Sequence, residues 1–486
     1  MSLASIPKIQ AEELLKHTTS RCPVCHAACP AEVWRVAGSP QKVFLKRTCP
    51  THGEASVCIA SDARFYWLAQ GKPENACCSS GACCSPQASA PPDGGALLNK
   101  MAFSAADYSA AGTLGRNSAG KGDGPFEKLS TCLALIEIVN SCNLTCPTCY
   151  ADSPAGIGAK VDAVPLEQLK SRIQGVIDRK GGIELLQLSG GEPTLHPQFF
   201  ELVEWAQANP GIDYLLLNTN GVRVATDDAF ADRLGKTFHY GGMQLYLQFD
   251  GAQLAGQEQL RGGDLRAMRV RAVERCGEMN LPITLAMTVT ADNLPHLWEG
   301  VEFGLKYKHI RGISFQPMFT SGRLPWAKER GGTPAAQHLN TADIILAAVE
   351  QSRGKLRFED FTPLPCGDPN CATIGYLLKV NGATHSISNF IDFTQVQGFL
   401  HDKVRYKLED LMQCGCESEP LGDLLKKFEL DETNTFRLFI KPFMDAFSWD
   451  EDRIDRCCTH VIRPDGKLDS FCRYYSGFSD VKPAPQ

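Results

Sequence analysis

Apolar runs and amphipathic segments alternate over the middle of this chain. The run at 133–139 is almost entirely apolar, which is typical of a strand buried on both faces of a parallel sheet. After it, apolar residues recur at helical spacing over 166–177, and Gly181 stands where such a helix would end. A short apolar strand is expected next, at 185–188. This order of elements predicts a parallel α/β domain.

The alternation continues through four further strands, expected at 214–217, 243–249, 283–289 and 312–316. With the strand at 133–139, the chain contains six β/α units, fewer than a closed eightfold barrel needs. The sequence therefore predicts an α/β fold, a partial (β/α)6 barrel over 131–345. An open barrel of this kind leaves a wide mouth for a bulky substrate.

The flanking segments differ in composition from the barrel. Residues 1–72 contain two cysteine knuckles around a short apolar strand and predict a rubredoxin- or zinc-ribbon-like module. Residues 73–130 contain closely spaced cysteines and then a stretch rich in Ala, Ser, Gly and Pro, as in a linker. Residues 346–486 carry further cysteines and are expected to form a C-terminal domain that holds auxiliary iron–sulfur clusters.

Charge and hydropathy indicate which kinds of partner the protein can bind and in which cell compartment it is expected. The formal net charge of −6 gives no electrostatic reason to bind nucleic acid or an anionic membrane. No run of about 18 apolar residues is present, and the first residues lack the pattern of a signal peptide. We therefore expect a cytoplasmic protein without a transmembrane segment, with peripheral membrane contact left open. In that reducing compartment, 21 cysteines indicate metal binding rather than disulfides.

The first cysteine group consists of a C-x2-C knuckle and a C-x2-H knuckle. Such a pair can present four ligands to one tetrahedral ion, either zinc or a rubredoxin-like iron. The residues are Cys22, Cys25, Cys49 and His52. If His52 were instead a surface residue of its turn, Cys29 or Cys58 would have to supply the fourth ligand.

A second group of four cysteines lies among small, turn-forming residues at 74–86. Thiols this close together could hold a cluster or a soft metal ion, or could lie in a loop without a function. The residues are Cys77, Cys78, Cys83 and Cys84.

A C-x3-C-x2-C motif follows directly after the first strand of the barrel. Three thiolates on a short loop can hold three irons of a [4Fe-4S] cluster and leave the fourth iron open to another ligand. A zinc loop and buried free cysteines are the alternatives. The residues are Cys142, Cys146 and Cys149.

Polar motifs follow the next strands in order. Ser-Gly-Gly-Glu-Pro at 189–193 combines glycines that allow close backbone approach with a carboxylate that can accept hydrogen bonds from an ammonium group. Asn218 and Asn220 end the following strand, where short amides suit the hydroxyls of a ribose. Arg261, in Arg-Gly after the next strand, fits a bidentate clamp on a carboxylate.

In this order, the motifs resemble those of the radical S-adenosylmethionine (radical SAM) superfamily. The resemblance implies that the open iron chelates SAM and that a delivered electron cleaves it to a 5′-deoxyadenosyl radical. It also implies that the backbone of Gly190 and Gly191, together with Glu192, holds the methionyl amine. Arg261 would hold the SAM carboxylate, and Gln248 would contact the ribose or the carboxylate.

Seven further cysteines lie beyond the barrel. Four suffice for one auxiliary [4Fe-4S] cluster, and seven leave room for a second, or for one completed from the cysteines at 77–84. Scattered core cysteines are the alternative. The residues are Cys366, Cys371, Cys414, Cys416, Cys457, Cys458 and Cys472.

Nearly the whole chain outside 75–130 resembles one multi-cluster branch of the superfamily. This branch contains the archaeal tetraether lipid synthase and proteins once proposed to be pterin methylases. The motifs that carry the resemblance, besides the N-terminal knuckles, lie at 187–195, 217–221, 249–251, 313–317 and 456–474.

The branch implies hydrogen abstraction from an unactivated sp3 carbon and carbon–carbon bond formation there, with a lipid chain as one candidate substrate. The expected cofactors are the SAM-binding [4Fe-4S] cluster, one or two auxiliary [4Fe-4S] clusters, SAM, and a mononuclear iron or zinc. A ferredoxin or flavodoxin would supply electrons. The alternatives are a radical methylase of a small, pterin-like metabolite and a non-catalytic electron carrier.

Overall fold

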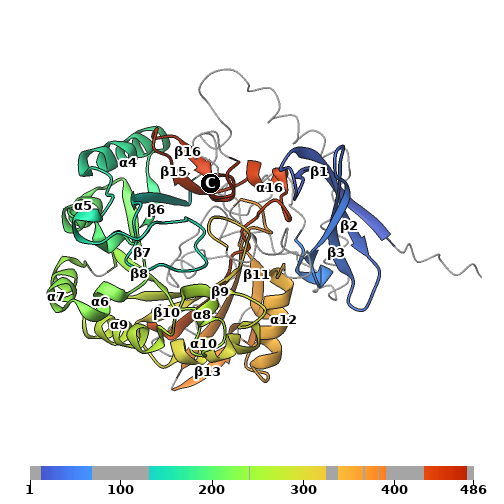
Figure 1. The fold of residues 1–486 in the computed structure, drawn as a ribbon. Helices are drawn as coiled ribbons and strands as arrows, with labels where there is room; N and C mark the ends of the chain where they lie inside the picture. The colour runs from blue at the N-terminus through green and yellow to red at the C-terminus, as the bar shows by residue number, and fades with distance from the viewer. Residues whose placement is uncertain are drawn as a thin grey trace, which may run out of the picture.

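The computed structural model contains two β-sheets, one with four strands and one with twelve (Figure 1). The smaller sheet is formed by the N-terminal segment, and the larger one contains the barrel strands together with C-terminal strands. The described residues are 12–67, 131–239, 241–324, 338–364, 367–380, 382–389 and 432–478.

The N-terminal sheet is an antiparallel meander. Its strands are β1 (Glu12–Arg21), β2 (Ala28–Val36), β3 (Lys42–Cys49) and β4 (Gly53–Ala60). Alternate residues such as Val33, Val43 and Leu45 are fully buried and form a small core of their own. The β1–β2 and β3–β4 turns lie at the same end of the meander, because the strands alternate in direction. The two knuckles predicted from the sequence occupy these turns.

The six parallel strands predicted for the barrel are present. They are β5 (Leu133–Val139), β6 (Ile183–Gly190), β7 (Ile212–Thr219), β8 (Met243–Gln248), β9 (Ile283–Val289) and β10 (Ile310–Pro317). Each pairs in parallel with the next, and helices connect them. In Figure 1 these helices lie on the outside of the arc that the strands form. The partial (β/α)6 barrel is therefore confirmed.

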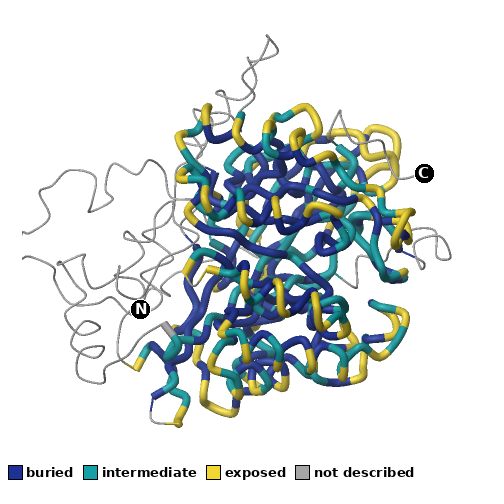
Figure 2. The backbone as a smooth tube through the Cα atoms, turned by 90° about the vertical axis from the view of Figure 1, so that its left-hand side faces the viewer, coloured by how far each residue is buried: buried dark blue, intermediate teal, exposed yellow. Residues whose placement is uncertain are grey.

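The connecting helices bury one face each against the strands. The major ones are α4 (Leu166–Lys180), α5 (Phe199–Ala208), α7 (Asp228–Thr237), α9 (Arg266–Glu278) and α10 (Leu297–Leu305). α4 ends at Gly181, whose φ of 83° is left-handed, as the sequence predicted. Pro165 forms the N-cap of α4. Figure 2 shows the buried backbone gathered in the interior and the exposed backbone along the outer turns.

Strands from the C-terminal segment extend both edges of the barrel sheet. On one side β14 (Thr435–Ile440) runs parallel to β10, followed by β12 (Thr373–Val380), which pairs with β11 (Phe361–Pro363) and β13 (Ala383–Ser386). On the other side β15 (Thr459–Ile462) runs parallel to β5 and pairs with β16 (Leu468–Ser470). The C-terminal segment therefore shares a sheet with the barrel. The boundary expected at residue 345 falls inside α12 (Thr341–Gln351).

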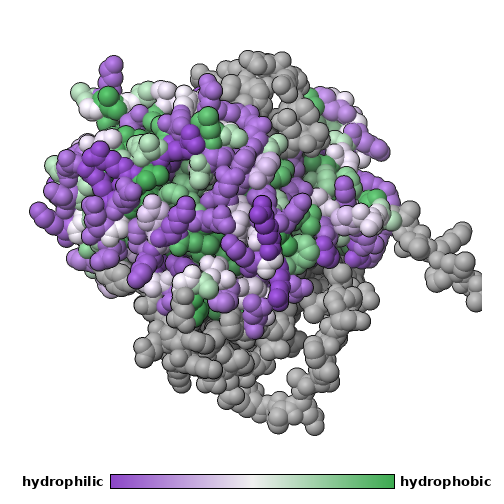
Figure 3. Space-filling view, turned by 90° about the horizontal axis from the view of Figure 1, so that it is seen from below, coloured by the Kyte–Doolittle hydropathy of each residue, from purple (hydrophilic) through white to green (hydrophobic). Residues whose placement is uncertain are grey.

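One hydrophobic core joins the barrel to the C-terminal strands. It includes fully buried residues of the barrel, such as Phe315, and of the C-terminal segment, such as Phe436 and Trp449. Cys276 belongs to it and is fully buried. On the face drawn in Figure 3, hydrophilic and hydrophobic residues are interspersed. No described helix has the length and apolarity required to cross a bilayer.

Candidate active site and metal centres

The three-cysteine loop follows β5 and is held at both ends by backbone hydrogen bonds. The Cys142 N–H donates to the Pro154 carbonyl over 2.9 Å, and Cys149 exchanges two backbone hydrogen bonds with Arg323. All three cysteines are free thiols, and all three line one cavity. Burial raises the pKa of Cys142 to about 12. A bound metal ion would favour the thiolate, because cations stabilise ligands in their deprotonated form.

The two glycines of Ser-Gly-Gly-Glu-Pro let the end of β6 touch the cysteine loop. Gly190 has a φ of 123°, and a Cβ atom there would stand 2.0 Å from the Val139 carbonyl oxygen. A Cβ on Gly191 would stand 2.1 Å from the Ser141 carbonyl oxygen. Only glycine fits at these two positions without moving the backbone that leads into the loop.

Glu192 is almost completely buried beside the loop. Its Oε1 accepts hydrogen bonds from Thr219 Oγ1 and Thr194 Oγ1, both at 2.7 Å, and its Oε2 accepts one from the Asn220 N–H at 2.8 Å. Burial raises the pKa of Glu192 despite these donors. Among the described residues, Oε2 accepts this one hydrogen bond, so it keeps acceptor capacity for an ammonium group in the cavity.

The two asparagines at the end of β7 have different surroundings. Asn218 donates to Ser189 Oγ over 3.1 Å and lines the cavity. Asn220 donates to Asn143 Oδ1 over 2.7 Å and approaches Cys142 Sγ at 3.7 Å. Asn220 therefore supports the cysteine loop, in addition to lying where a ribose was expected. The ribose contacts of both residues stay predictions.

Arg261 lies at the end of α8 (Gln257–Arg261) and lines the cavity. Its Nε and Nη2 donate to the two carboxylate oxygens of Asp250 over 2.6 and 2.9 Å. One edge of the guanidinium is therefore already engaged by protein, and only the remaining donors can reach a SAM carboxylate. Gln248 lines the same cavity, where its Oε1 accepts a hydrogen bond from Arg269 over 3.0 Å.

Asp250 and Arg269 are supporting residues that sequence reasoning did not assign. Arg269 is fully buried and lies 3.2 Å from Asp250. Burial by itself would raise the pKa of Asp250, but Arg261 and Arg269 together hold it below its ordinary value. Arg269 falls within the apolar stripe of α9. An arginine on an apolar helix face needs a buried partner. The position of Arg269 on such a face was therefore the one sequence feature that could have indicated this ion pair.

Four C-terminal cysteines lie within the described residues, and one of them, Cys458, lines the cavity. They are Cys371, Cys457, Cys458 and Cys472. Burial raises the pKa of Cys458 to about 12 and that of Cys472 to about 11, and Cys371 adds to both shifts. The other expected ligands, Cys366, Cys414 and Cys416, lie outside the described residues, as do Cys77, Cys78, Cys83 and Cys84.

Charged side chains hold the loop that carries Cys371. Arg453 donates to the Asn370 carbonyl over 2.9 Å and approaches Cys371 Sγ at 3.8 Å. Arg456 forms a 2.6 Å ion pair with Asp368, which is almost completely buried. Guanidinium groups beside a thiol set compensate negative charge, as thiolates bound to a cluster would require.

One cavity of about 280 Å³ lies between the two cysteine sets. Cys142, Cys146 and Cys149 line it on one side, and Cys458 lines it on the other. Aromatic rings connect the two sides. Tyr150 packs against Phe471 with ring centroids 5.6 Å apart, and Phe471 stacks on Phe443 at 4.1 Å.

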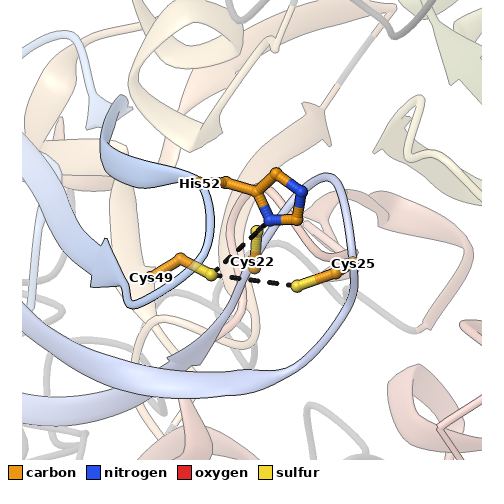
Figure 4. A group of neighbouring side chains, drawn as sticks. All are labelled: Cys22, Cys25, Cys49 and His52. Atoms are coloured by element: carbon orange, nitrogen blue, oxygen red, sulfur yellow. Dashed lines mark hydrogen bonds between the residues drawn. The ribbon is translucent and has the colours of Figure 1, made fainter.

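The N-terminal knuckles form a compact ligand set (Figure 4). The ligand atoms of Cys22, Cys25, Cys49 and His52 all lie within 4.8 Å of one another. Burial by itself would raise the pKa of Cys22, but backbone N–H groups of Cys25 and Val24 lower it to about 7. His52 points at the thiols, with Nδ1 3.6 Å from Cys22 Sγ. The four residues therefore fit one tetrahedral ion.

This module docks onto the segment that supports the second cysteine set. Lys16 forms a 2.5 Å ion pair with Asp450, and both side chains are almost completely buried. Arg47 donates to the carbonyls of Ala446 and Phe447 over 2.6 and 2.5 Å. Asp450 is the N-cap of α16 (Glu451–Asp455), the helix that carries Arg453. In Figure 1 the blue N-terminal strands lie beside α16.

Two family models match the chain. A model described as the HMPTM N-terminal zinc ribbon domain matches residues 14–61. A model described as the radical SAM superfamily matches residues 136–303. The first covers the four-ligand module, and the second begins within β5 and includes the three-cysteine loop, Glu192 and Arg261.

Relatives are found among characterised proteins and solved structures. The 7,8-dihydro-6-hydroxymethylpterin dimethyltransferase of Methanocaldococcus jannaschii is 26% identical over 529 residues, covering 94% of this chain and 93% of its own. The mycofactocin maturase MftC of Mycobacterium ulcerans is 30% identical over 220 residues, covering 44% of this chain and 55% of its own.

Among solved structures, Streptococcus suis SuiB bound to its precursor peptide SuiA superposes with a TM-score of 0.38 at 13% identity, covering 91% of this chain and 82% of that chain. The two family matches and the end-to-end relative agree with the motif order and with the partial barrel. The chain therefore contains a radical SAM domain with a zinc ribbon in front of it, and it is a radical SAM enzyme.

Proposed function

We propose that this enzyme abstracts hydrogen from an unactivated sp3 carbon and forms a carbon–carbon bond there, on a substrate held between two cluster sites. The observation that carries the proposal is the cavity that the three-cysteine loop shares with Cys458 of the second cysteine set. A substrate in that cavity would lie within reach of SAM on one side and of a second cluster on the other.

In this proposal Cys142, Cys146 and Cys149 hold three irons of a [4Fe-4S] cluster. When bound, such a cluster supplies the open iron and the electron with which the superfamily cleaves SAM. The loop's backbone anchors at Pro154 and Arg323 fix the spacing of the thiols. The tight approach of Gly190 and Gly191 fixes the position of β6 against the loop.

The residues around the loop would bind SAM by its charged ends. Glu192 receives the ammonium through Oε2, since burial and four donors hold that carboxylate in place. Arg261 is held in place by its ion pair with Asp250, and its remaining N–H donors would bind the SAM carboxylate. Asn218 and Gln248 also line the cavity, and their amide groups suit the ribose hydroxyls.

The remaining metal sites would have distinct roles. We propose that Cys371, Cys457, Cys458 and Cys472 hold an auxiliary [4Fe-4S] cluster whose Cys458 side faces the substrate. The ribbon residues Cys22, Cys25, Cys49 and His52 would hold zinc or iron away from that cavity. A ferredoxin or flavodoxin would deliver the electrons.

We propose a small, pterin-like ring rather than a lipid chain as the substrate. Amide and hydroxyl groups project from the inner faces of β8 to β10, where Gln316 donates to the Tyr246 hydroxyl over 2.7 Å and Gln244 donates to Thr284 over 3.2 Å. The remaining acceptor and donor capacity of these amides and hydroxyls suits the polar edge of a ring. The end-to-end relative is named a pterin dimethyltransferase, which agrees with this choice.

Metabolite and lipid profiling of a deletion strain, grown with methyl-labelled methionine, tests the substrate class. We expect one small polar metabolite to disappear, together with its label if SAM also donates the methyl group. The wild-type gene should restore it and the Cys142→Ala variant should not. An altered lipid profile with unchanged polar metabolites would overturn the proposed substrate and restore the lipid alternative.

A further inference from the structure

One face of β14 presents charged and aromatic side chains to the cavity in alternation. Arg437, Phe439 and Lys441 all line it, as expected for residues two apart on a strand. β14 pairs in parallel with β10, with Arg437 opposite Gly312 and Ile440 opposite Phe315. Arg437 therefore lies toward the start of the strands, whereas the cysteine loop and Glu192 follow the ends of β5 and β6.

Four other charged residues line the cavity, and protein groups engage each of them. Glu192 accepts its hydrogen bonds from threonines and backbone, and Arg261 is paired with Asp250. Arg323 lies 3.6 Å from the Asp152 carboxylate and donates to the Ser153 carbonyl over 2.7 Å.

Lys441 belongs with the second cysteine set. Its Nζ donates to Thr459 Oγ1 over 3.0 Å, next to Cys458 in the sequence. Its positive charge opposes the effect of burial on the pKa of Cys458. A cluster bound there would serve as the counter-charge of Lys441.

Arg437 differs from these residues. Within the part of the chain that the structure describes, no ion pair or side-chain hydrogen bond is found for its guanidinium, which is only half-buried and reaches the cavity. The described lining contains one carboxylate, that of Glu192, which already has four donors. A guanidinium presents a planar fork of N–H donors that matches phosphate and carboxylate oxygens.

We propose that Arg437 binds an oxyanion, a phosphate or carboxylate carried by the substrate, while Phe439 packs against the ring that bears it. The inference rests on the proposed function and adds to it that the small ring substrate is anionic. Strand geometry separates the Cα atoms of Arg437 and Lys441 by about 13 Å. The substrate would then extend from its anionic group near the start of the strands to its reacting carbon beside the cysteine loop.

The test measures binding of inorganic phosphate and acetate to the full-length, anaerobically reconstituted protein with SAM present, by calorimetry. Chloride holds the ionic strength constant, because screening alone weakens charge interactions. We expect at least one of the two anions to bind the wild type. Arg437→Gln should weaken this binding by at least about tenfold, the effect of losing one charged hydrogen bond, and Arg437→Lys should weaken it less.

The matched control is Arg233→Gln, which removes the same charge from the exposed face of α7 and should leave anion binding unchanged. SAM binding and iron content, measured on each variant, report whether the fold is intact. Equal anion affinity in Arg437→Gln and wild type, or no anion binding by the wild type, would overturn the proposal. SAM cleavage without substrate is measured separately, so loss of the anion site is distinguishable from failure of the proposed function.

Discussion

Replacing Cys142 with alanine is expected to abolish 5′-deoxyadenosine formation by reconstituted protein supplied with SAM and dithionite. Cys142 supplies one of the three thiolates on the loop after β5, and no further described cysteine lines that side of the cavity. Loss of a supporting residue around a metal site already costs up to about 100-fold, so loss of a ligand should cost at least that much. Product is measured by chromatography and iron by colorimetric assay.

Cys276→Ala is the matched control. Cys276 is fully buried in α9 and packs in the main core, away from the cavity lining. This variant should keep both its iron and its product. Wild-type product formation by Cys142→Ala would remove the three-cysteine loop from the proposed cluster site.

The second large effect is expected from Lys16→Met, at the interface between the ribbon and the C-terminal segment. The substitution leaves Asp450 almost completely buried without its ammonium partner, so the free energy of unfolding should fall by about 3–5 kcal/mol. Asp450 is the N-cap of α16, and α16 positions Arg453 beside Cys371. Iron retention at the second cysteine set should therefore fall as well. Thermal unfolding and iron content measure the two effects.

The control for this prediction is Lys46→Met. Lys46 forms a 2.7 Å ion pair with Glu12 on the ribbon surface, where both side chains are partly exposed to solvent. Exposed pairs contribute at most about 1 kcal/mol, so this variant should unfold near the wild-type temperature. Equal stability of the two variants would show that the buried pair does not hold the interface together.

Local patterns in the sequence were sufficient to predict the barrel. Each β/α unit repeats an apolar strand and an amphipathic helix, and signals such as Gly181 act over a few residues. The cysteine motifs were equally readable, because ligand spacing within one loop is a local property. His52 was predicted together with the ribbon cysteines, and its ring nitrogen does lie beside their sulfur atoms.

Contacts between distant segments could not be read in the same way. The insertion of β14 beside β10 and of β15 beside β5 joins the C-terminal segment to the barrel, where a separate domain was expected. Such pairings depend on which strand edges remain open after the barrel forms. The hydrophobic periodicity of a single segment gives no information about which strand edges remain open.

Buried charges were the other features that the sequence left hidden. Asp250 stood in a recognised motif, but its two arginine partners come from α8 and α9. Lys16 and Asp450 are separated by most of the chain, and each alone looks like a surface residue. Their pairing becomes visible only when the ribbon is seen against α16.

If the second cysteine set holds its own cluster, the iron content of a Cys371→Ala/Cys458→Ala double variant will show it. Relative to wild type, the variant should lose about four irons per chain, one cubane, while still cleaving SAM in the absence of substrate. Zinc counted in parallel separates the ribbon site from the clusters. Full retention of iron by the double variant would show that Cys371 and Cys458 hold no cluster.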